Sequence, residues 1–264
     1  MNIFLRELKA NRKALIIWSV YMFLLVASGM GKYSAYSAGG QANAAFDKIP
    51  YSIKALLGMG SLDMNTMSGY FAMLFVYIEL TAAIHAVLLG SSIIANEERD
   101  KTTEFLLVKP VSRTAVITSK LFAALINVIV INIVTLASSL ALVPIYNKGA
   151  DISGEVTMFI LSMFFVQLIF LSLGAALAAF LKNPKSSGSL GTGLLLVAYV
   201  IAKITDFTAE LNFLNLLSPF KYFNIYDLVA GNGLNLGIVI LSLVLVAIFS
   251  FSTYYFYRKR DLNV

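Results

Sequence analysis

Six long apolar runs, separated by polar segments, dominate the pattern of hydrophobic and polar positions along the chain. They cover residues 14–30, 70–95, 114–143, 156–181, 189–204 and 236–257. A helix needs about 20 predominantly apolar residues to cross the hydrocarbon core of a bilayer, and the first and fifth runs are the shortest of the six. The pattern predicts an all-α integral membrane protein whose six transmembrane helices form a single domain over residues 1–264.

Composition agrees with a membrane protein. Of the residues, 59% are hydrophobic and only 13% are charged, which is about half the charged fraction of an average soluble domain. The net charge of +6 would suggest a nucleic-acid partner for a soluble protein. Here the basic residues stand at the ends of the apolar runs, so we expect the lipid bilayer as a partner and no nucleic acid. The absence of cysteine excludes disulfides and cysteine metal sites.

Lysine and arginine residues are distributed unequally between the two sides of the predicted membrane domain. One side holds 14 of the 20, namely Arg6, Lys9, Arg12, Lys13, Arg99, Lys101, Lys109, Arg113, Lys120, Lys182, Lys185, Arg258, Lys259 and Arg260. The other side holds Lys32, Lys48, Lys54, Lys148, Lys203 and Lys221. Because cytoplasmic segments carry an excess of Lys and Arg, the richer side is predicted to be cytoplasmic. Both termini then lie on it, as an even number of spans requires.

The N-terminal region allows more than one interpretation. Residues 1–13 place an apolar stripe and a basic face at helical spacing, which predicts an amphipathic helix lying in the membrane interface; an ordinary basic tail is the alternative. Arg12-Lys13, followed by an apolar run that ends in Ala27-Ser28-Gly29, is also typical of a cleavable signal peptide. Since the run 14–30 is longer than a usual signal core of about 7–15 residues, we expect it to be retained as the first span.

Two longer segments lie on the predicted outer side. Residues 31–69 contain glycine, proline and scattered charges, which predicts a loop with short helical pieces. Residues 205–233 are largely apolar but are interrupted by Pro219 and Gly231, so they are too broken to span. We predict a re-entrant hairpin of short helices in the outer leaflet, covered by protein because lipid does not satisfy loose backbone groups. Its central residues are Pro219, Phe220, Tyr222 and Phe223.

Residues 96–113, NEERDKTTEFLLVKPVSR, form the only long charged segment of the chain. The charged side chains cannot lie in hydrocarbon, whereas the apolar residues 105–108 avoid water. Thr102 is a suitable N-cap, and Pro110 should end the helix near Val108. The segment is therefore predicted to be a short amphipathic helix between spans two and three that docks a cytosolic protein. The alternative is a charged loop, whose exposed ion pairs contribute about 0–1 kcal/mol each, but it does not account for the four consecutive apolar residues.

The run of residues 97–120, EERDKTTEFLLVKPVSRTAVITSK, resembles the cytoplasmic loop of ABC-2-type transporter permeases. In that family an acidic pair, a Thr-x-Glu-x-Leu-Leu segment, Pro-Val-Ser-Arg and a lysine occupy the turn between spans two and three. The corresponding residues here are Glu97, Glu98, Thr102, Glu104, Leu106, Leu107, Pro110, Val111, Ser112, Arg113 and Lys120. Residues 4–9 are similar to the family's amphipathic N-terminal helix and residues 217–223 to its outer hairpin, so the similarity covers essentially the whole chain.

The resemblance implies a half-transporter, the permease subunit of an ATP-driven exporter. A second permease subunit, identical or homologous, would pair with this chain, and a separate ABC ATPase subunit would dock between spans two and three. ATP and Mg would be bound by that ATPase, and this chain itself would hold no cofactor. The residues implied in coupling are Glu97, Glu98, Arg99, Thr102, Thr103, Glu104, Phe105, Leu106, Pro110 and Arg113. The expected location is the plasma (inner) membrane of a prokaryote.

Four polar residues inside predicted spans are candidates for a transport path: Glu79 and His85 in the second span, and Asn127 and Asn132 in the third. A charge at mid-bilayer costs roughly 2.5–3.5 kcal/mol, so it should face protein or water. Glu79 and His85 are six residues apart, about 240° around a helix, and so do not form one site. In depth, Glu79 is level with Asn132 and His85 with Asn127. The structural interpretation pairs them at those depths, and the functional one places them on a transport path.

Small residues gather in the later spans. They are Gly174, Ala175, Ala178 and Ala179 in the fourth span and Gly188, Gly191 and Gly193 at the start of the fifth. Since small residues let helices approach closely, we expect them to pack helices within the subunit, and a dimer face is the alternative.

Motifs for catalysis are missing from the sequence. There is no G-x-x-x-x-G-K-[ST] phosphate loop, and the single histidine excludes an H-E-x-x-H zinc site. We therefore expect that the chain is not an enzyme by itself and holds no metal. The alternative function is an ATP-independent secondary transporter or channel, which would usually show inverted repeats with broken spans near mid-membrane. No convincing repeat is visible in the sequence. A membrane scaffold without transport is the third alternative.

Overall fold

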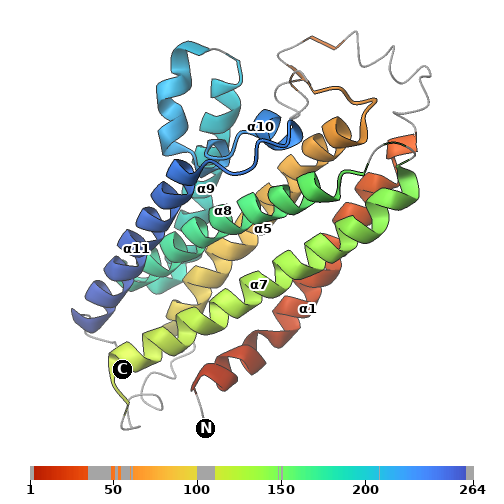
Figure 1. Cartoon of the computed structure of the whole chain (residues 1–264). Coiled ribbons are helices and arrows are strands. Elements are labelled where there is room, and N and C mark those ends of the chain that lie inside the picture. Colours follow the sequence, from red (N-terminus) through yellow and green to blue (C-terminus); the bar gives the residue numbers. More distant parts are fainter. Residues whose placement is uncertain are drawn as a thin grey trace.

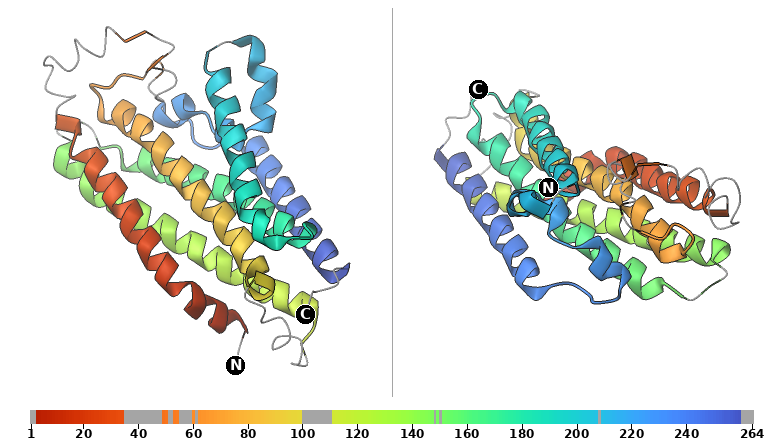
Figure 2. Two further views of the ribbon diagram at one scale, coloured as in Figure 1. Left: turned by 180° about the vertical axis from the view of Figure 1, so that it is seen from behind. Right: turned by 90° about the horizontal axis from the view of Figure 1, so that it is seen from above.

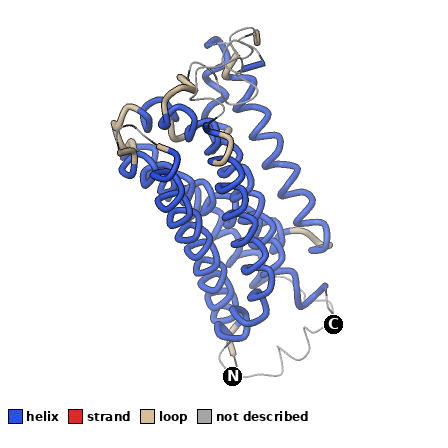
Figure 3. Tube along the Cα trace, turned by 90° about the vertical axis from the view of Figure 1, so that its right-hand side faces the viewer, coloured by secondary structure: helices blue, strands red, loops and turns tan. Residues whose placement is uncertain are grey.

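The computed structural model describes residues 3–34, 49–50, 53–54, 60, 62–99, 111–147, 149, 151–207 and 209–259. This part of the chain is helical and contains no strand (Figures 1 and 3). Its long helices are α1 (Ile3–Met30), α5 (Met67–Arg99), α7 (Arg113–Tyr146), α8 (Ser153–Phe180), α9 (Ser187–Thr205) and α11 (Leu236–Lys259). All six are long and apolar enough to cross a membrane. The all-α class is thereby confirmed, and the number of candidate spans equals the six predicted ones.

The helices continue past the ends of the apolar runs. The 34-residue helix α7 is about 51 Å long, well beyond a hydrocarbon core of about 30 Å. It begins where the Ser112 hydroxyl accepts a hydrogen bond from the Ala115 amide at 3.1 Å, a typical N-cap. Helix α5 similarly extends to Arg99. Backbone hydrogen bonding does not stop where lipid stops, so an apolar run marks the membrane and not the end of the helix.

Helix α1 is one continuous 28-residue helix, so the prediction of a separate amphipathic helix within residues 1–13 was wrong. From Ile3 to Ser28 the chain contains neither proline nor glycine, and nothing interrupts the intrahelical hydrogen bonds. The polar residues predicted to lie flat instead form the first turns of the spanning helix. At about 42 Å, α1 is long enough for these turns to emerge from the hydrocarbon.

The core lies between α5 and α8, which pack along each other in the middle of the bundle. Helices α1 and α7 pack together on one side of this pair, and α9 and α11 lie on the other (Figure 2). Burial follows the same order, since 72% of the apolar window of α5 is buried inside the subunit but only 11% of that of α11. The outer helices therefore present apolar side chains to lipid or to another protein.

Two glycines bring α5 and α8 into direct backbone contact. A Cβ atom added at Gly90 of α5 would collide with the carbonyl oxygen of Leu171, and one added at Gly174 of α8 would collide with that of Val87. The hydroxyl of Ser91 donates to the Gly174 carbonyl at 3.4 Å across the crossing. The small residues of α8 thus serve packing inside the subunit, as the sequence predicts, and their partner Gly90 was not foreseen.

The starts of α1 and α7 and the end of α11 meet at one end of the bundle, here called the terminal end (Figure 1). Ile3 packs against Val116, and an Arg113 guanidinium nitrogen donates to the Arg258 carbonyl at 3.1 Å. Both chain ends thus lie on one side of the bundle, as an even span count requires. Where they are described, the basic residues that the sequence analysis assigned to the richer side belong to helix ends and turns of this terminal end.

At the opposite end, here called the hairpin end, the chain folds back along α9. It passes Thr205 and returns through the 3₁₀ helices η2 (Ala209–Leu217) and η3 (Pro219–Lys221), the short helix α10 (Ile225–Val229) and then α11. The Ser218 hydroxyl donates to the Ala198 carbonyl at 2.8 Å. Ala198 lies seven residues before the end of α9, so the returning chain reaches back about 10 Å along the helix. Its place in the outer leaflet stays a prediction.

Candidate transport cavities and coupling end

The first candidate site is a cavity of about 320 Å³ at the hairpin end, here called the hairpin cavity. Its walls come from α5, α9, the hairpin segments and α10, with Gly60 and Leu62 completing the rim. The charged residues that line it are Glu79, Lys203, Asp206 and Lys221, and its aromatic residues are Tyr199, Phe220, Phe223 and Tyr226. Charge and aromatic surface are therefore combined in one hollow of an otherwise apolar bundle.

Asp206 holds the charged wall of the hairpin cavity together. Lys203, three residues earlier at the end of α9, approaches its carboxylate at 3.4 Å, and Lys221 of η3 forms a second ion pair with it. The ammonium group of Lys203 also lies 5.5 Å from the ring centroid of Tyr199, close enough for a cation–π contact. A lysine in the last turn is favoured by the helix dipole, and these contacts fix the hairpin against α9.

Glu79 faces this cavity from α5 and is 7% exposed. The predicted pairing of Glu79 with Asn132 is not found. The Asn132 amide nitrogen instead donates to the side-chain oxygen of Gln167 in α8 and, at 2.8 Å, to the Val128 carbonyl. Gln167 is completely buried, and sequence reasoning missed it. A lone glutamine in an apolar span was the only available signal.

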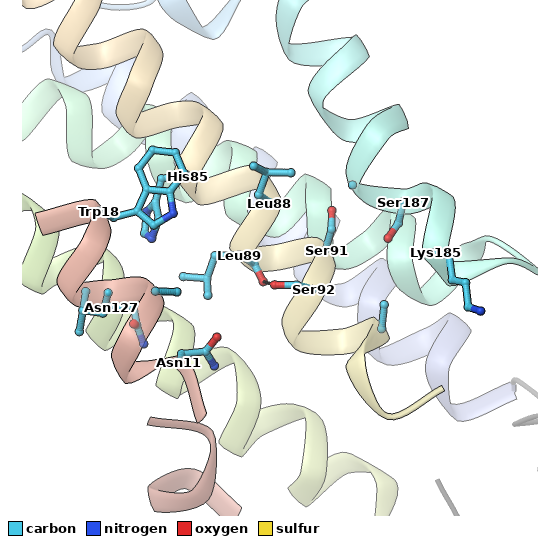
Figure 4. A pocket seen from close by; sticks show the side chains of 14 residues that line it. Asn11, Trp18, His85, Leu88, Leu89, Ser91, Ser92, Asn127, Lys185 and Ser187 are labelled. Carbon is cyan, nitrogen blue, oxygen red and sulfur yellow. Dashed lines mark hydrogen bonds between the residues drawn. The ribbon is translucent and has the colours of Figure 1, made fainter. Parts of the chain in front are cut away.

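The second candidate site is a cavity of about 250 Å³ toward the terminal end, here called the terminal cavity (Figure 4). Its lining residues come from α1, α5, α7, the 3₁₀ helix η1 (Pro184–Ser186) and the start of α9. The polar ones are Asn11, His85, Ser91, Ser92, Asn127, Lys185 and Ser187. His85 is 4% exposed and packs against Trp18 with ring centroids 5.1 Å apart. Its Nδ1 atom has no hydrogen-bond partner within the part of the chain that the structure describes.

His85 and Asn127, which the sequence places at one depth, line the terminal cavity together. They do not form a side-chain pair, since the Asn127 amide donates to the Ala123 carbonyl of its own helix at 2.7 Å. Glu79 and His85 line different cavities, in agreement with their angular separation of about 240° around the helix.

Packed side chains separate the two cavities. Along α5, Glu79 and His85 are about 9 Å apart, and Ala82 and Ala83 between them are completely buried. The Gln167 side chain of α8 donates to the Ala82 carbonyl at 3.4 Å in the same layer. The two cavities share no lining residue, and this stretch of α5 between them is buried.

The coupling residues predicted between spans two and three are only partly described. Glu97, Glu98 and Arg99 belong to the last turns of α5, and their side chains lie outside the description. Thr102, Thr103, Glu104, Phe105, Leu106 and Pro110 fall outside the described residues, so the predicted coupling helix is not tested. Arg113, the first residue of α7, contacts Arg258 of α11.

Lys120 was predicted to lie on the side that is richer in Lys and Arg, within the span of residues 114–143. It is completely buried, and its ammonium group donates to the Ile93 carbonyl of α5. A buried ammonium group needs hydrogen-bond acceptors, and α5 supplies one. Lys120 thus joins α7 to α5 just inside the predicted docking segment.

Comparison with protein families matches residues 1–262 to the model of the ABC-2 family transporter protein. The chain belongs to the ABC-2 transporter family. This ABC-2 permease is a multi-pass membrane protein of ABC transport. A comparison with curated proteins gives no match.

In this ABC-2 permease the four predicted hairpin residues are packed inside the subunit. Pro219, Phe220, Tyr222 and Phe223 are all buried. The Phe220 ring packs against Phe170 of α8 and Tyr199 of α9, at centroid distances of 5.3 and 5.5 Å. The most exposed apolar residues of the hairpin are Phe213, Leu216 and Leu217 of η2. The four buried residues hold the hairpin on the bundle, and two of them, Phe220 and Phe223, also line the hairpin cavity.

Proposed function

We propose that this ABC-2 permease is one half of an exporter driven by a separate ATPase subunit, which binds the segment between α5 and α7. The observation that carries the proposal is the joint between these two helices. Lys120 of α7 donates to the Ile93 carbonyl of α5, and residues 100–110, with their acidic and apolar side chains, join the same two helix ends. A push on that segment would therefore move α5 and α7 together.

Movement of α5 would reach both cavities. The helix carries Glu79 in the hairpin cavity and His85 in the terminal cavity, and it is packed along most of its length against α8. A rigid helix that tilts under force at one end changes the walls of both hollows at once. ATP binding and hydrolysis, with Mg, would take place in the ATPase subunit, and this chain would convert the closure of that subunit into alternate opening.

The proposed assembly contains a second permease subunit and two ATPase subunits. Many apolar side chains of α1, α9 and α11 are not covered by the subunit itself. In the assembly they would face lipid, the second permease subunit or both. The terminal end would be cytoplasmic because it carries the greater number of basic residues. The membrane would be the plasma (inner) membrane of a prokaryote.

The ATP-independent carrier or channel is kept as a second candidate because each cavity is formed within a single subunit. A carrier of that kind would move its cargo without any partner. The two candidates therefore differ in whether a purified permease is active alone.

The test is co-expression with an ATPase chain encoded beside the permease, followed by purification and reconstitution in proteoliposomes. We expect a complex with two copies of each subunit, whose ATPase activity falls when Glu104→Gln or Arg113→Ala is introduced. Asp227→Asn, an exposed acidic residue of α10, is the matched control and should leave the activity unchanged. Cargo movement by the permease without ATPase would support the second candidate instead.

A further inference from the structure

The two walls of the hairpin cavity carry unequal charges. On the wall formed by α9 and η3, the ammonium groups of Lys203 and Lys221 share the single carboxylate of Asp206, so this wall has one positive charge in excess. On the α5 wall, Glu79 is 93% buried, and no hydrogen bond to its carboxylate is found among the residues that the structure describes. Lys203 forms its close ion pair with Asp206, and it attracts the Glu79 carboxyl group only through space, without a hydrogen bond.

The remaining lining of the hairpin cavity suits a small organic molecule. Phe220, Phe223 and Tyr226 present aromatic surface beside the charged groups, and aromatic faces attract ammonium groups within about 6 Å of the ring centroid. The cavity volume of about 320 Å³ is at the lower end of the range for ligand pockets, roughly 300–1,000 Å³. A molecule that fits this cavity would therefore be small and partly apolar.

We propose that the hairpin cavity binds a zwitterion that carries a primary ammonium group and a carboxylate or phosphate group. The ammonium group pairs with Glu79, and the anionic group pairs with Lys203 and Lys221. A ligand with only a positive charge would leave the excess charge of the lysine wall unmatched. A ligand with only a negative charge would leave Glu79 buried without a partner, which is costly.

Two sources share this chemistry: a free amino acid or short peptide, and the headgroup of phosphatidylethanolamine. The binding test uses the full-length permease alone, so its outcome does not depend on ATPase coupling. The protein is placed in phosphatidylglycerol nanodiscs, and the dipeptide Leu-Leu is titrated by saturation-transfer NMR beside N-acetyl-Leu-Leu and Leu-Leu-amide. The acetyl group removes the ammonium charge, and the amide removes the carboxylate charge.

We expect the dipeptide to bind about 10-fold more tightly than either blocked form, the effect of losing one charge-assisted hydrogen bond. Glu79→Gln should abolish the preference over the acetylated peptide and keep the preference over the amide. Lys203→Gln should do the reverse, because Asp206 remains paired with Lys221. Asp227→Asn, which does not line the cavity, is the control and should retain both preferences. Thermal unfolding of each variant verifies that it is folded.

The lipid source is tested by native mass spectrometry of the permease in detergent. Stronger retention of phosphatidylethanolamine than of phosphatidylglycerol, lost in Glu79→Gln, would assign the site to a lipid headgroup. Equal retention of the two lipids, together with dipeptide preference, would assign it to a soluble zwitterion. The proposal is overturned if neither zwitterion is preferred over its singly charged counterparts, or if folded Glu79→Gln and Lys203→Gln proteins keep both preferences.

Discussion

The crossing of α5 and α8 offers a direct test of how this bundle is held together. In Gly90→Ala, the new Cβ would lie 2.9 Å from the carbonyl carbon of Leu171 and 3.1 Å from the amide nitrogen of Ala175, besides colliding with the Leu171 oxygen. These are backbone atoms of α8, so no side chain can rotate away. The two helices must separate by several tenths of an ångström, and both lose dispersion contacts along their shared face.

Overpacking of this kind costs about 1–3 kcal/mol. For a chain of this size, a loss of that magnitude lowers the midpoint of thermal unfolding by about 3–10 °C. Gly193→Ala provides the matched control, because it makes the same chemical change in α9 at a position where a Cβ would have no atom within 4 Å. Alanine is the better helix former by up to about 1 kcal/mol, so the control should be neutral or slightly stabilised.

Purified permease variants in the same detergent can be compared by the temperature at which the monodisperse peak is lost in fluorescence-detected size exclusion. The expected order of stability is Gly193→Ala at or above the unmodified chain, with Gly90→Ala clearly below it. If Gly90→Ala were as stable as Gly193→Ala, backbone contact between α5 and α8 would not contribute to stability, and the description of the core given above would be refuted.

Two further predictions concern orientation and the joint at the terminal end. The chain has no cysteine, so Lys185→Cys and Lys32→Cys each create a single thiol; in intact cells a membrane-impermeant maleimide should label only the second, and the opposite result would reverse the proposed orientation. Lys120→Met should lower the free energy of unfolding by about 1.5–3 kcal/mol, because it removes a buried charge-assisted hydrogen bond to Ile93. Denaturation monitored by Trp18 fluorescence measures this, and an unchanged stability would contradict it.

The spans were predictable because their number and approximate limits depend only on the length of apolar runs. The rotation of each helix about its own axis was not. Depth matching paired His85 with Asn127, and both line the terminal cavity without a hydrogen bond between them. It also paired Glu79 with Asn132, but the Asn132 side chain donates to Gln167. Two residues at one depth meet only if both face the same neighbour, and that depends on the packing of the whole bundle.

The hydrophobic pattern did not predict where charged residues continue a helix or enter the core. The charges in residues 1–13 suggested a separate element, although the helix runs through them. Lys120 was assigned to the side that is richer in Lys and Arg, and its complete burial was not foreseen. A lysine near the end of a span can direct its long side chain inward to a carbonyl of the adjacent helix. The sequence contains no pattern that distinguishes this from an exposed lysine.

Glu79 is difficult to explain by stability alone. A carboxylate this deep in a span costs roughly 2.5–3.5 kcal/mol on insertion scales, and its neighbours Val76 and Ile78 on α5 are apolar and buried. A buried ion pair would offset part of that cost, but Lys203, whose charge acts on Glu79, forms its close ion pair with Asp206. An apolar side chain at this position would stabilise the bundle more. The presence of Glu79 at this position therefore agrees with a binding site whose carboxylate gains a partner only when a positively charged group enters.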